Sequence, residues 1–324
     1  QNLIGRVGRS GKMTEGNVIF TQNHYRDFKL LESCHIEDCS SSLLCIIKPL
    51  PYLNKTFQFK DINVWKKFYL KDISINDAIS ILISDNCLQD EKIIKQLKNE
   101  IQIRQEFIEK IENYFLFLVE QLSQEEIEEF SKKLLCYFLA SISEKETLLS
   151  IISEVGRKIL LSVAPLQRKK YAITMQGTEK AKLLYDFCND NIETLVSFEN
   201  TTDLVHAFLP IFQNGSFFKK IKSYNFKDIE LEKLMLAWIK GEKYSSIFEE
   251  IKDKTNKSNV EEFISLFTSE LSYSGALIVN SVFEILKEKL TLENQIMYSL
   301  FQKQLKYGLF SSLEIELYEL GFCD

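Results

Sequence analysis

The stretch that decides the fold runs from Glu91 to Leu122, EKIIKQLKNEIQIRQEFIEKIENYFLFLVEQL, without a proline or a glycine. Its apolar residues recur three and four positions apart, which is the spacing of one face of an α-helix. This face consists of Ile93, Ile94, Leu97, Ile101, Phe107, Ile108, Ile111, Phe115 and Leu118. A long amphipathic helix must bury such a face against other elements, so the stretch predicts a mainly α protein.

The same periodicity continues along most of the chain after Ser74. Ser123-Gln124-Glu125-Glu126 is a capping box that predicts a helix start, and Ser143-Glu144-Lys145-Glu146 repeats the signal. Gly241 follows the stretch from Asp228 to Ile239 and suits a left-handed C-cap. Helices are expected over 74–84, from 123, from 143, from 178, and over 201–214, 228–239, 244–253, 258–272, 274–290, 292–307 and 311–320. We expect more than about 60% helix, against roughly a third in an average globular protein.

Composition limits the classes of protein that the chain can belong to. Its 324 residues are 45% hydrophobic and 27% charged, with a net charge of −6, which is ordinary for a soluble globular protein. This charge argues against an overall basic surface for nucleic acid, but it leaves room for a basic channel. The seven cysteines are an odd number without a secretory signal, so we expect a cytoplasmic protein. No apolar run approaches the roughly 20 residues of a membrane span, and no membrane association is predicted.

Glycine and proline divide the chain unevenly. Residues 1–22 are its only glycine-rich stretch, and Asn17-Val18-Ile19-Phe20 within them is typical of a short strand. A second apolar run, Leu43–Ile47, is followed by Pro49 and Pro51, which mark a domain boundary. We therefore expect a small α/β part with one or two short strands, then a connector, then two helical domains. These parts cover residues 1–48, 49–72, 73–200 and 201–324. The helical region from residue 73 is expected to fold by itself.

The string that carries chemistry is Gln1-Asn2-Leu3-Ile4-Gly5-Arg6-Val7-Gly8-Arg9-Ser10-Gly11. Two arginines three positions apart at a helix end share one face, so both can reach one triphosphate. Their planar guanidinium groups suit a phosphoryl group on which charge develops. A phosphate loop is excluded as an interpretation because Arg6 stands where its first glycine is required, and Met13 stands where Ser or Thr would bind magnesium. A chance glycine–arginine loop before a strand is the remaining alternative.

The string resembles motif VI of superfamily-two helicases of the DEAD/DEAH-box (DExH) type, Q-x-x-G-R-x-G-R. Asn2 stands where the family pattern has Gln. The resemblance implies that the chain is the C-terminal part of an ATP-dependent helicase and that residues 1–48 end its second RecA-like lobe. It assigns ATP binding to Gly5, Arg6, Gly8 and Arg9. The arginines Arg6 and Arg9 would be catalytic, contacting the γ-phosphate.

The resemblance also implies cofactors and partners. ATP and Mg²⁺ would be bound mainly by N-terminal RecA-like lobes that carry the phosphate loop and the Asp-Glu box. Neither motif occurs in this sequence, so the chain alone is not expected to hydrolyse ATP. The other expected partner is DNA or RNA. Weaker similarities to helical domains of related helicases occur in three segments. These are Leu236–Gly241, Tyr171–Gly177 and Tyr307–Phe322.

Basic side chains beside aromatic ones are candidates for contact with nucleic-acid phosphates. Arg168-Lys169-Lys170-Tyr171 is the first candidate, although a solvated helix start has the same pattern. Phe217-Phe218-Lys219-Lys220 is equally ambiguous, with core packing favoured for its phenylalanines. Trp238 is expected in the core rather than stacked on a base. A non-enzymatic helical module that binds proteins is the alternative to a helicase.

A metal site is not predicted. Cys34, His35, Cys39 and Cys45 are potential zinc ligands, but ligands crowded into one short stretch would form a cramped site. His206 is expected to pack on a helix.

Overall fold

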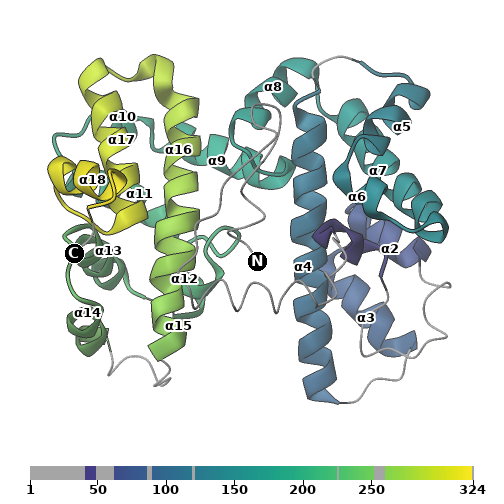
Figure 1. Cartoon of the computed structure of the whole chain (residues 1–324), viewed down its shortest axis with the longest axis horizontal. Helices are drawn as coiled ribbons and strands as arrows, with labels where there is room; N and C mark the ends of the chain where they lie inside the picture. The colour runs from purple at the N-terminus through teal and green to yellow at the C-terminus, as the bar shows by residue number, and fades with distance from the viewer. Residues whose placement is uncertain are drawn as a thin grey trace, which may run out of the picture. The chain divides into compact units, whose positions relative to one another are not determined.

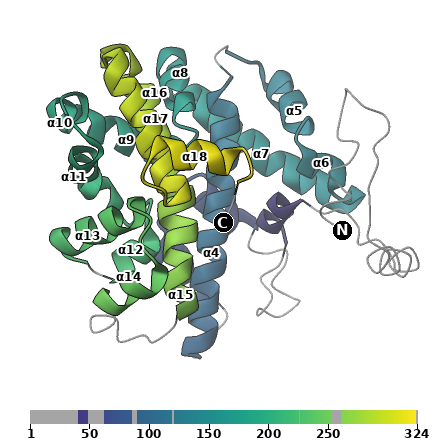
Figure 2. The ribbon, with the colours of Figure 1, turned by 60° about the vertical axis from the view of Figure 1, so that its left-hand side comes forward.

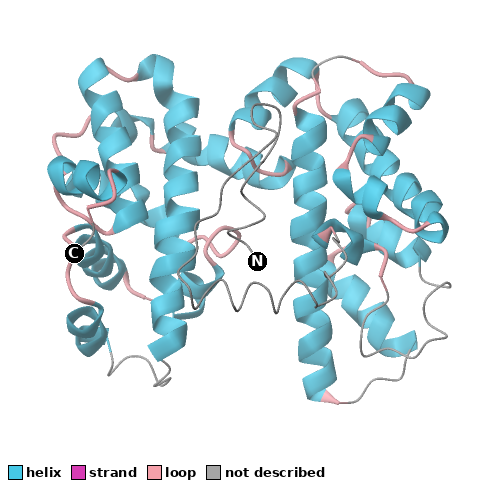
Figure 3. Cartoon of the chain, viewed as in Figure 1, coloured by secondary structure: helices cyan, strands magenta, loops and turns pink. Residues whose placement is uncertain are grey.

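The computed structural model describes residues 41–48, 62–85, 90–118, 121–224, 226–251 and 260–322. Helices make up 80% of these residues and none of them forms a strand, so the predicted mainly α fold is confirmed (Figures 1 and 3). The chain divides into two compact units, Gln1–Ser42 and Leu43–Asp324. Nearly all of the first unit lies outside the described residues, and with it the strand predicted at 17–20.

Most of the predicted helices occur, together with unpredicted ones over 62–69, 135–139, 192–196 and 219–224. The helices before residue 175 are η2 Ser42–Ile46, α2 Ile62–Tyr69, α3 Ile75–Asp85, α4 Glu91–Leu116, α5 Gln124–Lys132, α6 Leu135–Leu139, α7 Ile142–Ser162 and α8 Pro165–Ile173. Those after it are α9 Thr178–Asp190, α10 Ile192–Val196, α11 Thr201–Phe212, α12 Lys219–Tyr224, α13 Asp228–Ile239, α14 Tyr244–Ile251, α15 Val260–Ser265, η5 Leu266–Gly275, α16 Ala276–Leu286, η6 Lys287–Lys289, α17 Leu292–Tyr307 and α18 Ser312–Glu319.

Several ends differ from the predicted ones for identifiable local reasons. The apolar run Leu43–Ile47 lies in the part expected to contain strands, yet it forms the 3-10 helix η2. The second capping signal also starts two residues earlier than predicted. Ser141, not Ser143, is the N-cap of α7, and its N–H donates to the Glu144 carboxylate over 2.9 Å. Two overlapping Ser-x-x-Glu frames occur at this point, and the sequence does not distinguish them.

The helices predicted over 258–272 and 274–290 are continuous in the structure. A π-helical segment, η5, joins α15 to α16, where a break was expected (Figure 1). Glu270 in this segment accepts hydrogen bonds from the N–H groups of Lys220 (2.7 Å) and Ile221 (2.8 Å), and so caps α12. A Cβ at Gly275 would lie 3.0 Å from the Phe212 ring, so glycine permits this close packing. The π-helical turn is therefore stabilised by contacts that lie far away in the sequence.

Two separate apolar cores hold the second unit together. The first extends from Leu44 to Ala172 and is built around α4 and α7, and the second extends from Leu184 to Leu305 and is built around α11, α13, α16 and α17. The change from one core to the other therefore falls within 172–184, near the turn between α8 and α9. The predicted domain division near residue 200 stays a prediction, because a change of core is not a domain boundary.

Candidate functional site

The residues that the helicase resemblance assigns to ATP lie outside the described part of the chain. These residues are Gly5, Arg6, Gly8 and Arg9. Three of the four potential zinc ligands, Cys34, His35 and Cys39, lie outside it as well. Among the described residues, no group of His, Cys, Asp or Glu side chains is placed to hold a metal ion. The candidate site that the structure describes is therefore the basic run on α8.

Arg168 does not have the exposed position that a phosphate contact needs. Its side chain is fully buried, and its guanidinium donates to the Leu160 carbonyl at the end of α7 over 3.2 Å. Arg168 therefore ties α8 to α7, and its burial does not favour its assignment to nucleic acid, which stays a prediction. Lys169 and Lys170 are exposed, and neither pairs with a carboxylate in the described part of the chain.

Exposed apolar side chains accompany the two lysines. Leu166 is 70% exposed, Ile173 is 40% exposed, and Met175 just beyond the helix is 62% exposed. Leu166 and Ile173 are seven positions apart and lie on one face of α8. We call Leu166, Lys169, Lys170, Ile173 and Met175 the α8 platform. It combines positive charge with apolar surface, as groups that bind both phosphates and bases require.

Hydrogen bonds from α9 and α16 support the backbone of the α8 platform. The Tyr185 hydroxyl donates to the Lys170 carbonyl over 3.0 Å, and burial raises the pKa of this phenol to about 12, so the donor keeps its proton further into the alkaline range than an ordinary tyrosine does. The Ser281 hydroxyl of α16 donates to the Thr174 carbonyl over 2.8 Å. Met175 has a φ of 55°, an unusual conformation for a residue other than glycine. The sequence pattern showed the lysines but not these supports or the apolar neighbours.

The second basic and aromatic run is used inside the fold. Phe218 is buried and stacks on Phe212 with ring centroids 4.5 Å apart. Core packing was predicted for the phenylalanines of this run. Lys219 pairs with Glu106 over 2.7 Å, and Lys220 donates to the hydroxyls of Ser265 at the end of α15 and Ser269 in η5. This run therefore offers a ligand less free charge than the α8 platform does.

Trp238 lies in the second core, as predicted. It is 8% exposed, and its indole N–H donates to the Leu305 carbonyl over 2.8 Å. Gly308 packs against its ring, because a Cβ there would lie 2.9 Å from it. Two of the segments with weak helicase similarity thus contact each other through the indole. His206 is half-exposed rather than packed, and it lies 3.4 Å from the Glu232 carboxylate.

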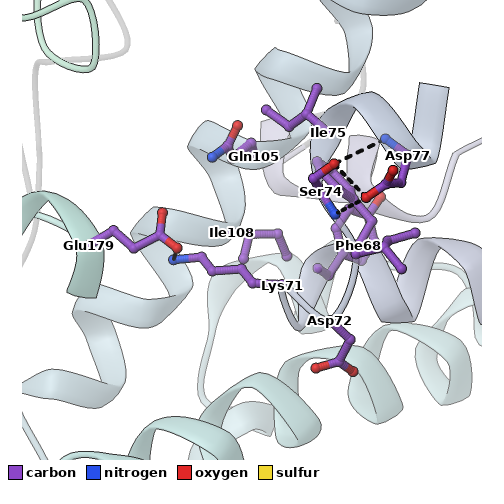
Figure 4. A pocket seen from close by; sticks show the side chains of 11 residues that line it. Phe68, Lys71, Asp72, Ser74, Ile75, Asp77, Gln105, Ile108 and Glu179 are labelled. Carbon is purple, nitrogen blue, oxygen red and sulfur yellow. Dashed lines mark hydrogen bonds and ion pairs between the residues drawn. The ribbon is translucent and has the colours of Figure 1, made fainter. Parts of the chain in front are cut away.

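A cavity of about 420 Å³ with both polar and apolar lining residues lies where α2, α3, α4 and α9 approach one another (Figure 4). Lys71, another residue with positive φ (58°), reaches across it toward Glu179 and also pairs with buried Glu112 over 2.8 Å. Ser74 and Asp77 satisfy each other at the start of α3 by hydrogen bonds of 2.6 to 3.2 Å. Since these polar groups are already paired, the cavity shows no vacant charge that would select a ligand.

No family model, no curated protein and no solved structure matches this chain. Within the described residues, no helix is both long enough and apolar enough to cross a membrane.

Proposed function

We propose that this chain is the C-terminal part of an ATP-dependent helicase or translocase that acts on DNA or RNA. The observation that carries the proposal is the string Gly5-Arg6-Val7-Gly8-Arg9, followed by Gly16 and the apolar run 17–20. Glycines beside paired arginines suit a site where a backbone must approach a triphosphate closely and positive charge must meet it.

The chain's own part in catalysis would be electrostatic. Arg6 and Arg9 would contact the γ-phosphate of ATP held between this lobe and an N-terminal RecA-like lobe. Arg9 would stabilise the charge that develops on the transferred group, a role worth about 10³ to 10⁵ in rate. Mg²⁺ supplies further charge neutralisation when bound, through residues of the N-terminal lobe.

The α8 platform supports a nucleic-acid substrate. No acidic residue occurs from Arg157 to Thr178, whereas five basic ones do. Arg157 and Lys158 bind Gln124 and Asp72, whereas Lys169 and Lys170 are exposed and pair with no carboxylate in the described part of the chain. A strand laid across α8 would place phosphates at these lysines and bases on Leu166 and Met175.

The decisive experiment is Arg9→Ala in the intact protein that includes the N-terminal lobes. Nucleic-acid-stimulated ATP turnover should be lost, while ATP affinity and strand binding remain, because the guanidinium acts on charge that appears only during transfer. Arg9→Lys should not restore turnover, since one ammonium cannot reproduce a planar fork of donors. Arg26→Ala, outside the motif, is the matched control. Near-normal turnover in Arg9→Ala would refute the assignment of the motif.

The alternative, a non-enzymatic protein-binding module, is favoured by one observation. Leu135, Phe138 and Ile142, at the α6–α7 junction, are 66%, 67% and 93% exposed. Exposed apolar side chains in such a group are typical of protein contact surfaces. An intact protein that neither turns over ATP nor binds single strands would support this module and exclude the helicase.

A further inference from the structure

One face of α4 carries three carboxylates at intervals of three residues, Glu106, Glu109 and Glu112. Each pairs with a lysine from a different element. Glu112 pairs with Lys71 after α2 over 2.8 Å, Glu109 with Lys180 of α9 over 2.7 Å, and Glu106 with Lys219 of α12 over 2.7 Å. The outer two pairs join the helix at the centre of the first core to α9 and α12, which contribute buried side chains to the second.

We call these three ion pairs along α4 the ladder. Burial of the carboxylates falls steadily along it. The carboxylate side chains of Glu112, Glu109 and Glu106 are 4%, 14% and 51% exposed. Successive members lie about 4.5 Å apart along the helix axis. An ion pair in solvent contributes little and is screened by salt, whereas a buried one is screened much less. Salt should therefore weaken the pair at Glu106 much more than the pair at Glu112.

The inner end of the ladder lies beside the turn that connects the cores. The Glu112 carboxylate accepts hydrogen bonds from the N–H (3.0 Å) and the hydroxyl (2.9 Å) of Thr178, at the start of α9. A Cβ at Gly177 would lie 2.7 Å from the same carboxylate, so the approach depends on glycine. The turn itself contains Met175 with its positive φ. Ser281 holds the turn from the other side at the Thr174 carbonyl.

At the outer end of the ladder, the Glu106–Lys219 pair lies at the edge of a cavity. This cavity of about 240 Å³ lies between α4, α9 and the start of α12, and Gln102, Leu183 and Ser216 are among its lining residues. The buried apolar side chains on its two sides belong to separate cores. The two cores belong to one compact unit, and here ion pairs beside a cavity, rather than shared core side chains, lie between them. Lys219 itself is fixed to the second core, because Glu270 binds the next two backbone N–H groups of α12.

We infer that the two helical cores are hinged at the turn 174–177 and that the Glu106–Lys219 ion pair is the releasable latch of this hinge. When the latch opens, the solvent-facing cavity between α4 and α12 widens, while Glu112 keeps α9 attached to α4. This inference does not rest on the proposed helicase function. Its basis is the gradient of burial along α4 and the separation of the two cores.

Charge reversal in the 324-residue chain tests the latch, with the radius of gyration measured by small-angle X-ray scattering at low and high NaCl. The wild-type chain should expand as salt rises. Glu106→Lys and Lys219→Glu should each be expanded already at low salt, because like charges then face each other. The double variant, Glu106→Lys with Lys219→Glu, should return to the compact radius at low salt, since the pair is restored with its signs exchanged.

Lys222→Glu is the matched control, since Lys222 is exposed on α12 and should leave the wild-type radius unchanged. Unchanged helix content by circular dichroism shows that a larger radius reports opening rather than unfolding. A Glu106→Lys chain as compact as the wild type at low salt overturns the inference. So does a double variant that stays as expanded as the single ones.

Discussion

Trp238 shows how single residues connect distant parts of this fold. Its indole is hydrogen-bonded to a carbonyl 67 residues away and its ring packs on Gly308, whose φ is 64°. Gly241, which follows the C-cap Lys240 of α13, also lies close to Gly308, because a Cβ on Gly241 would be 3.1 Å from the Gly308 carbonyl oxygen. Each of these two glycines meets two requirements, a left-handed backbone conformation and a close approach of another part of the chain.

Gly308→Ala is therefore predicted to destabilise the protein for two reasons. A left-handed alanine costs roughly 1 to 2 kcal/mol, and its methyl group would collide with the Trp238 ring at 2.9 Å. We expect a loss of more than about 2 kcal/mol in the free energy of unfolding, measured by urea denaturation. Gly321→Ala is the control, because Gly321 has a φ of 89° and nothing within 4 Å. Equal losses in both variants would show that the contact with Trp238 contributes nothing.

Tyr69 gives a prediction for alkaline pH. Its hydroxyl donates to the Ile46 carbonyl over 2.6 Å, and burial raises its pKa from the ordinary 10.0 to about 12. The unfolded tyrosine therefore loses its proton first, and the stability that Tyr69 contributes below pH 10 is lost as pH rises toward 12. Tyr69→Phe should lower stability at neutral pH, because the Ile46 carbonyl loses its donor, and should make the alkaline decline shallower.

The measurement is the free energy of unfolding of both proteins at a series of pH values between about 9 and 12. Tyr273→Phe is the control, because Tyr273 is 69% exposed and lies far from this hydrogen bond in sequence. Parallel pH curves for the wild type and Tyr69→Phe would contradict the prediction. Other buried groups, such as Cys188, whose pKa is raised to about 12 by burial, should keep part of the decline in both proteins.

At the scale of single helices, α8 shows what a sequence pattern can and cannot locate. The run Arg168-Lys169-Lys170 was predicted as a unit, but a helix turns its side chains in different directions. Arg168 lies four positions before buried Ala172 and so shares its buried face. That spacing is present in the sequence and would have separated Arg168 from the exposed lysines.

Lys169→Glu with Lys170→Glu is predicted to weaken binding of single strands by the intact protein. For each phosphate that the variant no longer binds, the slope of log affinity against log salt should also become shallower by about 0.7 for single strands. Lys132→Glu with Lys133→Glu makes the same change of charge at an exposed lysine pair near the end of α5 and should bind normally. Binding titrations at several salt concentrations provide both numbers. A similar weakening in both double variants would indicate a general effect of charge rather than the α8 platform.

Helix positions were predictable from the sequence because caps and periodicity are local signals. Ser123 caps α5, and Gly241 ends α13 in the left-handed conformation, both as predicted. The contacts between distant segments are not local signals. Glu106 and Lys219 are 113 residues apart, and nothing in either neighbourhood indicates that they pair. The π-helical turn at η5 likewise depends on Phe212 and on the backbone of α12, which no periodicity reveals.

At the scale of the whole molecule, the first core reaches further toward the N-terminus than the predicted boundary at residue 73. Leu44, Ile46, Phe68 and Tyr69 are all at most 5% exposed and belong to this core together with α4 and α7. The segment expected to be a connector, 49–72, therefore includes a helix, α2, that supplies core residues. The second core begins at Leu184 and needs none of them.

This arrangement predicts different behaviour for two fragments. A chain of residues 41–324 retains both cores. We therefore expect it to have native helix content before urea unfolds it. A chain of residues 73–324 lacks the buried side chains of Leu44, Ile46, Phe68 and Tyr69. Removing one such side chain from a packed core costs about 2 to 5 kcal/mol. The total stability of a typical protein is only about 5 to 15 kcal/mol. The first core of this shorter chain should be loosely packed while the second stays folded. Limited proteolysis with mass spectrometry should then cut it early between residues 73 and 172 and spare 184–305. Equal protease resistance of the two fragments would show that η2 and α2 are dispensable and that the helical region folds from residue 73, as its sequence alone suggested.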